Sequence, residues 1–378
     1  MQLVLNVIIL FLIFLAIGCV AFESKINDVE LNLKKAKIIT FVMAIGFTFR
    51  SLGLDIIYYQ EMYDKQAALD WGVFFSQKIL GAEVEPGFIL IMVILKAFNL
   101  PFEVFLLVSV AIPFYIILFL AVKSSKHVVL VVSMFFLLFT AKFMDAIRAG
   151  LAASLFLLCL YQYSRGKYLI SFFVYIISIL FHYSNAAAFF AFPFFFIRWD
   201  AAKIIAASIL SALIGFLVKN YLIIDFQDSE YAILWKLSYY INSDFYKFVN
   251  ITHAFFWYLL GYIHVLGSTV LIFYISLNGG VTFLSRFDRL AFGSMIVGLL
   301  VCIFFAFLGA EIIGLRLHFF FGLSSIFLIP KYLTNKDNGS INKIKYTYVY
   351  NSLLFYNAIY IVYSAGIFVP GSPLYLGN

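Results

Sequence analysis

Long apolar segments separated by short polar loops make up most of this chain, and this pattern limits its fold more than any other feature. Soluble proteins average roughly 45–50% apolar and about 25% charged residues. Here 64% of the 378 residues are hydrophobic and only 12% are charged. A helix needs about 20 apolar residues to cross a bilayer. The sequence therefore predicts an all-α, polytopic transmembrane helix bundle that forms a single domain over residues 1–378.

Basic residues recur in alternate loops, which predicts the orientation of the bundle. Lysine and arginine collect in the cytoplasmic loops of membrane proteins. The basic loops lie near residues 25–37, 123–127, 163–167, 198–203, 286–289 and 331–345. We place these loops inside, and we place both termini and two polar external loops, 55–86 and 219–252, outside. This arrangement has about 12 spans and explains the net charge of +7 without a nucleic-acid partner.

The apolar segment Pro86–Phe98 is too short to cross a membrane, so it predicts a short or re-entrant helix. Counted as a full crossing, it would move the basic pair Lys123 and Lys126 to the outer side. Counted as re-entrant, it leaves them in the cytoplasm, as the loop-charge rule requires.

The stretch from residue 141 to residue 185 predicts where functional groups meet. Two apolar segments, Asp145–Tyr163 and Tyr168–Phe181, are joined by a basic hinge. An antiparallel helix pair returns its far ends to one face. We therefore expect Asp145 and Arg148, at the start of the first segment, to meet His182, which follows the second. Asp145 and Arg148 are three residues apart, so on one helix Asp145 would orient the guanidinium.

Three of the seven arginines, Arg50, Arg148 and Arg316, fall at predicted outer ends of spans. A charged group near the membrane edge is costly unless it is paired or hydrated. One interpretation is that each arginine reaches the interface or pairs with the acid nearest in sequence. Because all three lie on one predicted face, and guanidinium forks match phosphate oxygens, we favour a shared anionic ligand.

The remaining charged and polar residues do not indicate other chemistry. Four arginines are interpreted only as markers of the cytoplasmic loops: Arg165, Arg198, Arg286 and Arg289. The three cysteines all lie inside apolar segments and predict neither a disulfide framework nor a metal site. No His or carboxylate pair inside a predicted span has the i, i+3 or i, i+4 spacing of metal ligands. We therefore expect no metal and no other cofactor.

Four short motifs in the first half of the chain resemble those of a known family. They are Arg50-Ser-Leu-Gly53-Leu-Asp55 with Tyr58 or Tyr59, Glu85-Pro-Gly-Phe88, Ala146-Ile147-Arg148-Ala-Gly-Leu-Ala152, and Phe181-His182-Tyr-Ser184. In order and spacing they resemble the R…(V/L)GxDxxxY, E-x-G-[FY], IRQxLA and FHxS elements of EpsG-like proteins. These proteins are a branch of the Wzy-type polymerases of bacterial O-antigen and exopolysaccharide. One departure is Ala149, where the family often has glutamine.

The resemblance covers roughly residues 35–200 and beyond them includes only the topology and Arg316. It implies a glycosyltransferase of the GT-C-like class in the bacterial inner membrane, independent of metal. Such an enzyme joins undecaprenyl-diphosphate-linked oligosaccharide repeat units on the periplasmic face. The resemblance also implies a chain-length regulator protein as a partner, beside the membrane lipid.

The residue chemistry fits this implied reaction. A lipid diphosphate leaves already charged, so it needs cations, which the three outward arginines can supply in place of a metal. The acceptor hydroxyl needs a base within hydrogen-bond reach. The candidates are His182, Glu85, Asp55 and Asp145. His182 ranks first because a neutral imidazole accepts a proton near pH 7. Glu85 ranks second because burial would raise its pKa.

Two other functions stay open at this point. A membrane O-acyltransferase that modifies polysaccharide also needs a membrane histidine and arginines, but the chain has no early histidine of that kind. A flippase for lipid-linked oligosaccharide should carry charges deep in the bundle and have two similar halves, whereas no internal repeat is present.

Overall fold

The structure is a computed structural model, and it describes residues 12–21, 29–48, 56–65, 85–221, 251–277, 285–333 and 342–364. Within these ranges every regular element is helical, as the hydropathy pattern predicts. The first half contains α2 (Val29–Thr48), α3 (Ile56–Lys65), α5 (Pro86–Ala97), α6 (Phe102–Ser124), α7 (Val128–Asp145), α8 (Ile147–Ser164) and α9 (Tyr168–Phe181). Three short pieces follow: η1 (Tyr183–Ala186), α10 (Ala187–Ala191) and η2 (Phe192–Phe196). The second half contains α11 (Ala201–Tyr221), α14 (Ile251–Leu277), α15 (Arg286–Leu308), α16 (Glu311–Gly322), α17 (Ser325–Leu333) and α18 (Lys343–Ser364).

Four of the described helices, α6, α8, α11 and α15, are long and apolar enough to cross a membrane. A fifth crossing results if α16 and α17, which meet at a bend of 62°, form one broken span. The chain is therefore a membrane protein. The count of about 12 spans and the single-domain organisation remain predictions, and much of the external loops 55–86 and 219–252 lies outside the described residues.

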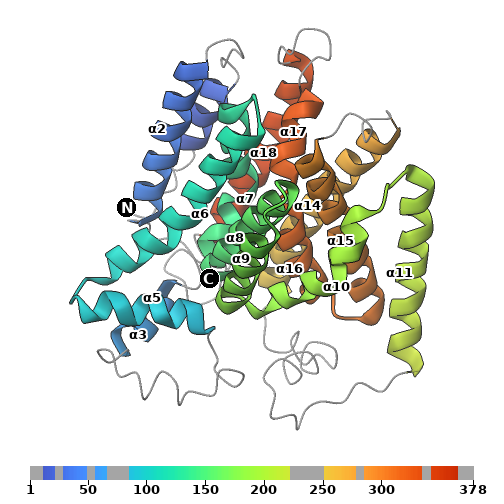
Figure 1. Cartoon of the computed structure of the whole chain (residues 1–378), viewed down its shortest axis with the longest axis horizontal. Helices are drawn as coiled ribbons and strands as arrows, with labels where there is room; N and C mark the ends of the chain where they lie inside the picture. The colour runs from blue at the N-terminus through green and yellow to red at the C-terminus, as the bar shows by residue number, and fades with distance from the viewer. Residues whose placement is uncertain are drawn as a thin grey trace.

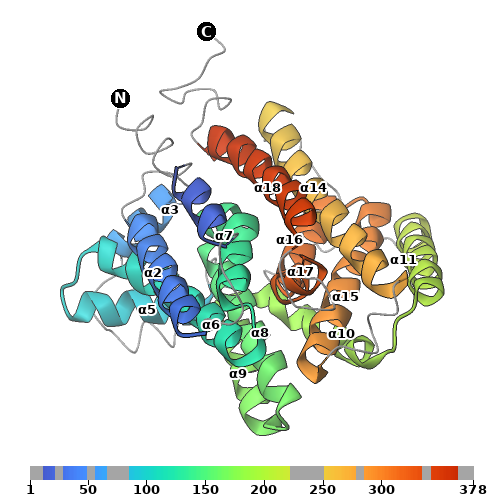
Figure 2. The ribbon, with the colours of Figure 1, turned by 90° about the horizontal axis from the view of Figure 1, so that it is seen from above.

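Aromatic side chains fill the core between the helices of the first half. Phe114 on α6 makes edge-on contacts with Phe47 on α2 and with Phe135 and Phe136 on α7, at ring-centroid distances of 5.3, 5.4 and 4.8 Å. Edge-to-face packing of this kind adds to the free energy of apolar burial. Figures 1 and 2 show α2, α6 and α7 gathered in one group, with α11 at the opposite edge of the molecule.

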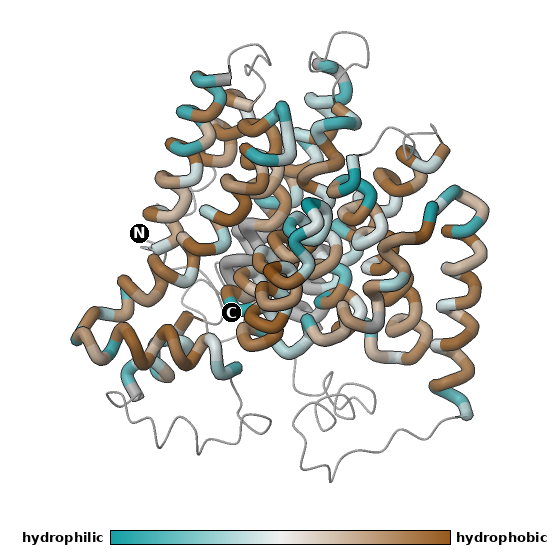
Figure 3. The backbone as a smooth tube through the Cα atoms, viewed as in Figure 1, coloured by the Kyte–Doolittle hydropathy of each residue, from teal (hydrophilic) through white to brown (hydrophobic). Residues whose placement is uncertain are grey.

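The helix ends beside the predicted cytoplasmic segments lie together. In Figure 1 each of these ends is at the upper end of its helix. They are the first half of α2, the ends of α6, α8 and α17, and the starts of α11, α15 and α18. Hydrophilic segments mark many of the same ends in Figure 3. The described parts of these basic segments therefore lie toward one side of the bundle. That this side faces the cytoplasm stays a prediction. We call it the basic side.

The short helix expected after residue 85 is present as α5, which has 12 residues. At 1.5 Å per residue, 12 residues reach about 18 Å, well short of a hydrocarbon core of about 30 Å. In Figure 1, α5 lies across the direction of α2 and α6 at the lower left of the molecule, with α3 beside it. The start of α5 therefore lies far from the basic side.

Two sequence predictions about the neighbouring segments need correction. Asp145 ends α7 and does not begin α8, because Ala146 leaves the helical conformation at φ −120° and ψ 61°. Asp145 and Arg148 therefore do not share one helical face. The segment predicted to return as one helix, Asn185–Ile197, instead forms short helical pieces that belong to η1, α10 and η2. Pro193, which has no N–H to donate, is the second residue of the last of these pieces.

Candidate functional site

One carboxylate, at the start of α5, connects two helices that are distant in sequence. Glu85 Oε2 accepts a hydrogen bond from Arg148 Nη1 at 2.5 Å, and Glu85 Oε1 lies 2.9 Å from His182 Nδ1. Only 7% of the Glu85 side chain is exposed, against 20% for Arg148 and 25% for His182. An acid, a guanidinium and an imidazole thus meet as the sequence predicts, but the acid described there is Glu85. The side chain of Asp145 is outside the described part of the chain.

The sequence Glu85-Pro-Gly-Phe88 explains how the carboxylate reaches its partners. Pro86 occupies the first turn of α5, where its fixed φ suits a helix start and its missing N–H costs nothing. A Cβ atom on Gly87 would lie 2.8 Å from the Leu180 carbonyl oxygen. Only glycine therefore allows α5 to begin against the end of α9. This close approach places Glu85 beside His182.

Arg148 is held from its other side by an aromatic pair. Its Nε donates to the Tyr59 hydroxyl at 3.4 Å, and its guanidinium lies 5.7 Å from the Tyr59 ring centroid and 6.0 Å from that of Phe88. Such positions allow cation–π attraction. Tyr59 is 1% exposed, whereas Tyr58 is 42% exposed. Of the two tyrosines in the first motif, Tyr59 is thus the one that contacts the arginine.

The imidazole of His182 is positioned by the end of α9. The backbone N–H of His182 donates to Ser178 and Ile179, and the chain then leaves the helix at φ −160°. The Tyr175 hydroxyl donates to the carbonyl oxygens of Asn185 and Ala186, at 3.0 and 3.2 Å, and so fixes the turn that follows. An ionised carboxylate only accepts hydrogen bonds, so His182 Nδ1 carries the proton toward Glu85. In the neutral imidazole, Nε2 is then the acceptor.

The electrostatics of the group keep Glu85 ionised. Burial raises the pKa of the Glu85 carboxyl, but the hydrogen bond with His182 and the positive charge of Arg148 outweigh burial and lower this pKa to about 2. The sequence-based expectation of a raised pKa is therefore wrong: burial does raise the pKa of Glu85, but the pKa as a whole is lowered. A carboxylate of such low basicity orients and stabilises its neighbours. It is a poor proton acceptor near neutral pH.

A comparison of the sequence with known protein families identifies the family of this chain. The model of the EpsG family matches residues 36–371. This chain belongs to the EpsG family. An EpsG-family chain is a polysaccharide-polymerase-type membrane protein with glycosyltransferase-like activity. No curated protein and no solved structure matches the chain.

Of the other residues predicted for the site of this EpsG-family protein, only Arg316 has a side chain that the structure describes. Arg50 and Asp55 lie outside the described residues. Arg316 is an exposed residue of α16, and the contacts that hold Glu85 do not include it. In the described part of the chain, no three His, Cys, Asp or Glu side chains come together as metal ligands. The shared diphosphate site and the absence of a metal both remain predictions.

Sequence reasoning missed the central position of Glu85 and the contact between Tyr59 and Arg148. The available signal was the pattern of an acid followed by proline and glycine at the start of an apolar helix. An ionisable residue at that place needs a partner, and the glycine indicates that another backbone passes close by. The sequence does not say which backbone that is.

Proposed function

We propose that this protein is a polysaccharide polymerase of the bacterial inner membrane. It would join undecaprenyl-diphosphate-linked oligosaccharide repeat units by glycosyl transfer on the periplasmic face, within a GT-C-like bundle of about 12 spans. The observation that carries the proposal is a partly exposed imidazole held by a buried carboxylate, away from the basic side of the bundle. Family membership supports polymerisation over O-acyl transfer or flipping.

His182 acts as the general base in this proposal. Its Nδ1–H donates to Glu85, so Nε2 is the nitrogen that accepts the proton of the acceptor sugar hydroxyl. The hydroxyl oxygen then attacks the anomeric carbon of the lipid-linked chain, and the lipid diphosphate leaves with the electrons of the broken C–O bond. The Glu85 carboxylate holds the ring in one tautomer and stabilises the imidazolium that forms, as the carboxylate does in a Ser-His-Asp triad.

Arg148 stabilises the leaving group in this proposal. A guanidinium has five N–H donors, and Glu85 and Tyr59 use only two of them. The remaining donors can bind diphosphate oxygens, with Arg50 and Arg316 as the other two proposed ligands. The departing diphosphate is already an anion, so positive charge and not a proton donor is what its departure requires.

The test is the surface-polysaccharide ladder of a deletion strain that carries plasmid copies of the gene. The strain with His182→Ala should show single repeat units capped onto the surface lipid, whereas His127→Ala, a matched change on the basic side, should restore the full ladder. A full ladder from His182→Ala would contradict the proposed base. Undelivered units inside the deletion strain would indicate a flippase. An intact ladder in the deletion strain with reduced acetyl content would indicate an O-acyltransferase.

A further inference from the structure

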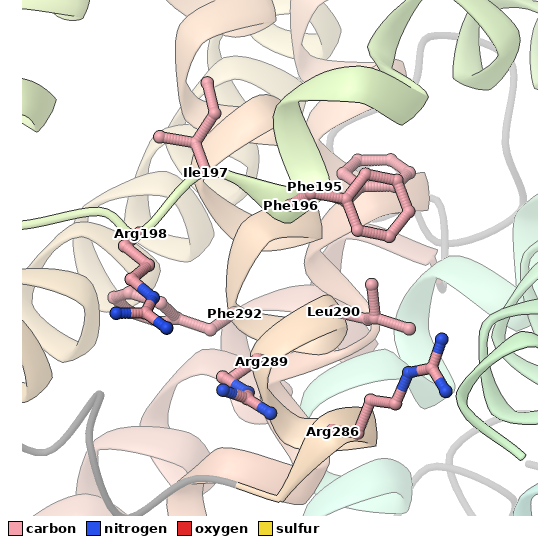
Figure 4. A pocket seen from close by; sticks show the side chains of 8 residues that line it. All are labelled: Phe195, Phe196, Ile197, Arg198, Arg286, Arg289, Leu290 and Phe292. Carbon is pink, nitrogen blue, oxygen red and sulfur yellow. The ribbon is translucent and has the colours of Figure 1, made fainter.

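Three arginines that the sequence presents only as topology markers line one pocket. Arg198, Arg286 and Arg289 surround a cavity of about 280 Å³ on the basic side (Figure 4). Arg198 follows η2, while Arg286 and Arg289 lie in the first turn of α15. The rest of the lining is apolar: Phe195, Phe196, Ile197, Leu290 and Phe292.

Among the described residues, no carboxylate pairs with the three arginines of this pocket. Asp288 accepts hydrogen bonds from Ser285 and Lys331, and Asp200 is paired with Lys203 at 2.7 Å. Within the described ranges, the side chains of Arg198 and Arg289 have no hydrogen bond or ion pair, and that of Arg286 donates only to the Tyr168 hydroxyl. Like charges so placed repel one another. An anion in the cavity would relieve this repulsion.

The packing of η2 against α15 fixes the shape of the pocket. A Cβ atom on Gly293 would lie 2.8 Å from both Cα and the carbonyl oxygen of Phe195, so glycine is required for this approach. The buried Trp199 donates through Nε1 to the Phe194 carbonyl at 3.0 Å. Lys203 Nζ donates to the Arg198 carbonyl at 3.0 Å. Arg198 is thereby held opposite the two arginines of α15.

The pocket lies where a membrane span meets its polar boundary. Arg286 is the first residue of α15, one of the helices long and apolar enough to cross a membrane. Phe196 and Ile197, on the pocket wall, are 48% and 41% exposed. The pocket therefore combines guanidinium groups at one end with exposed apolar side chains at the other. A phospholipid has two matching parts: a charged phosphate headgroup and apolar acyl chains.

We propose that this pocket binds the phosphate headgroup of an acidic membrane lipid. The guanidinium forks of the three arginines contact the phosphate oxygens, since their planar donors match that geometry. The acyl chains run over Phe196 and Ile197. Basic pockets between helices at a membrane surface recognise acidic lipids in this way. The site is separate from the Glu85 group and does not depend on the proposed polymerase reaction.

The test measures lipid binding to the purified full-length protein in phosphatidylcholine nanodiscs. Phosphatidylglycerol is added in steps, and the bound fraction is read by native mass spectrometry. Each single change of Arg198, Arg286 or Arg289 to glutamine should weaken binding about fivefold, and the triple variant about a hundredfold. The matched control is Arg165→Gln, an exposed arginine on the same side but outside the pocket, which should bind as wild type does.

Two further measurements test whether the guanidinium geometry is needed and whether the ligand is a lipid or free phosphate. The triple arginine-to-lysine variant keeps the charge and loses the fork, so its binding should fall between those of wild type and the glutamine triple. Inorganic phosphate shares the headgroup's chemistry without the chain, so it should compete only weakly. Wild-type phosphatidylglycerol binding by the glutamine triple would overturn the proposal. Competition by inorganic phosphate at the same concentration as the lipid would overturn the assignment to a lipid.

Discussion

A histidine that accepts a proton from a sugar hydroxyl at one ring nitrogen is oriented by a hydrogen bond at the other. In this protein the Glu85 carboxylate makes that hydrogen bond with His182. Glu85 also binds Arg148, so the same side chain orients the proposed base and the proposed diphosphate ligand. A buried charge that lacks a partner costs several kcal/mol. The three side chains should therefore behave as one unit when any of them is changed.

We expect His182→Ala to lower the rate of polymerisation about 10²–10⁴-fold, the usual contribution of a general base. The measurement is turnover of a lipid-linked repeat unit by purified protein. Arg148→Lys should also lower the rate, because lysine keeps the charge but loses the fork that reaches Glu85 and Tyr59. Glu103→Gln, an exposed acid in the first turn of α6, is the control. Equal rates for His182→Ala and the control would contradict the role of the imidazole.

Glu85 and Arg148 should be coupled in stability. Glu85→Gln leaves the arginine without its carboxylate, and Arg148→Met leaves the carboxylate without its arginine. Each change should therefore destabilise the protein by about 3 kcal/mol. The double variant should cost clearly less than the sum, because it leaves neither charge without its partner. The stability of the wild type, the two single variants and the double variant is measured by thermal unfolding in detergent. Strictly additive losses of stability would show that the pair does not interact.

The low pKa of Glu85 predicts a loss of stability in acid. The free carboxyl has a pKa of 4.5, and the folded protein lowers it to about 2. Between these values the unfolded chain binds more protons, so stability present above about pH 4.5 is lost as the pH falls toward about 2. The melting temperature of the wild type should decline over this range. The melting temperature of the Glu85→Gln variant should decline less steeply with falling pH. Equal slopes for the variant and the wild type would contradict the ion pair.

At the scale of elements, the site depends on how the start of α5 packs against the end of α9. Neither helix end would place Glu85 and His182 together on its own, and Gly87 permits the contact. The same device recurs on the basic side, where Gly293 lets η2 approach α15. In both places a glycine brings two backbones close, and charged side chains gather beside the contact.

Gly87→Ala should lower activity at least tenfold and destabilise the protein by about 1–3 kcal/mol, because the added methyl group must push α5 away from the Leu180 carbonyl. Gly46→Ala on α2 is the matched control. A Cβ atom there has nothing within 4 Å, so alanine should be neutral or slightly stabilising. Activity in the polymerisation assay and the melting temperature are measured for both. A fully active Gly87→Ala variant would mean that the close approach is not needed.

At the scale of the whole molecule, the Glu85 group and the predicted cytoplasmic segments lie at different ends of the bundle. The basic helix ends gather on one side, and the Glu85 group lies at the far end of the α8 and α9 pair from the turn that joins these helices. The proposed base and the basic side thus lie at opposite ends of this helix pair.

Cysteine labelling should place the α8–α9 turn and the residues after α9 on opposite sides of the membrane. In a background without the three native cysteines, Arg165→Cys and Ser184→Cys occupy exposed positions in these two places. A membrane-impermeant maleimide should label Ser184→Cys in intact spheroplasts and should label Arg165→Cys only after lysis. Labelling of both residues from the same side would contradict the predicted orientation.

Much of this protein follows from its sequence. Apolar runs with few charges must be helices in a membrane, because backbone groups have no water to bond there, and the basic loops divide those helices into two sides. The short helix after residue 85, the shared side of the basic segments and the meeting of Arg148 with His182 were predictable for these reasons. The end of α7 was not, because helix limits are weakly encoded once polar residues enter an apolar run.

Only the tertiary structure decided which acid completes the site. Glu85 is 63 residues from Arg148 and 97 from His182, and no local periodicity extends over such distances. Asp145 is closer in sequence, yet the break at Ala146 separates it from the helix that carries Arg148. The contact exists because α5 begins against α9, and that packing depends on the shape of two surfaces. Sequence determines the helices and their charges, while packing determines which charges meet.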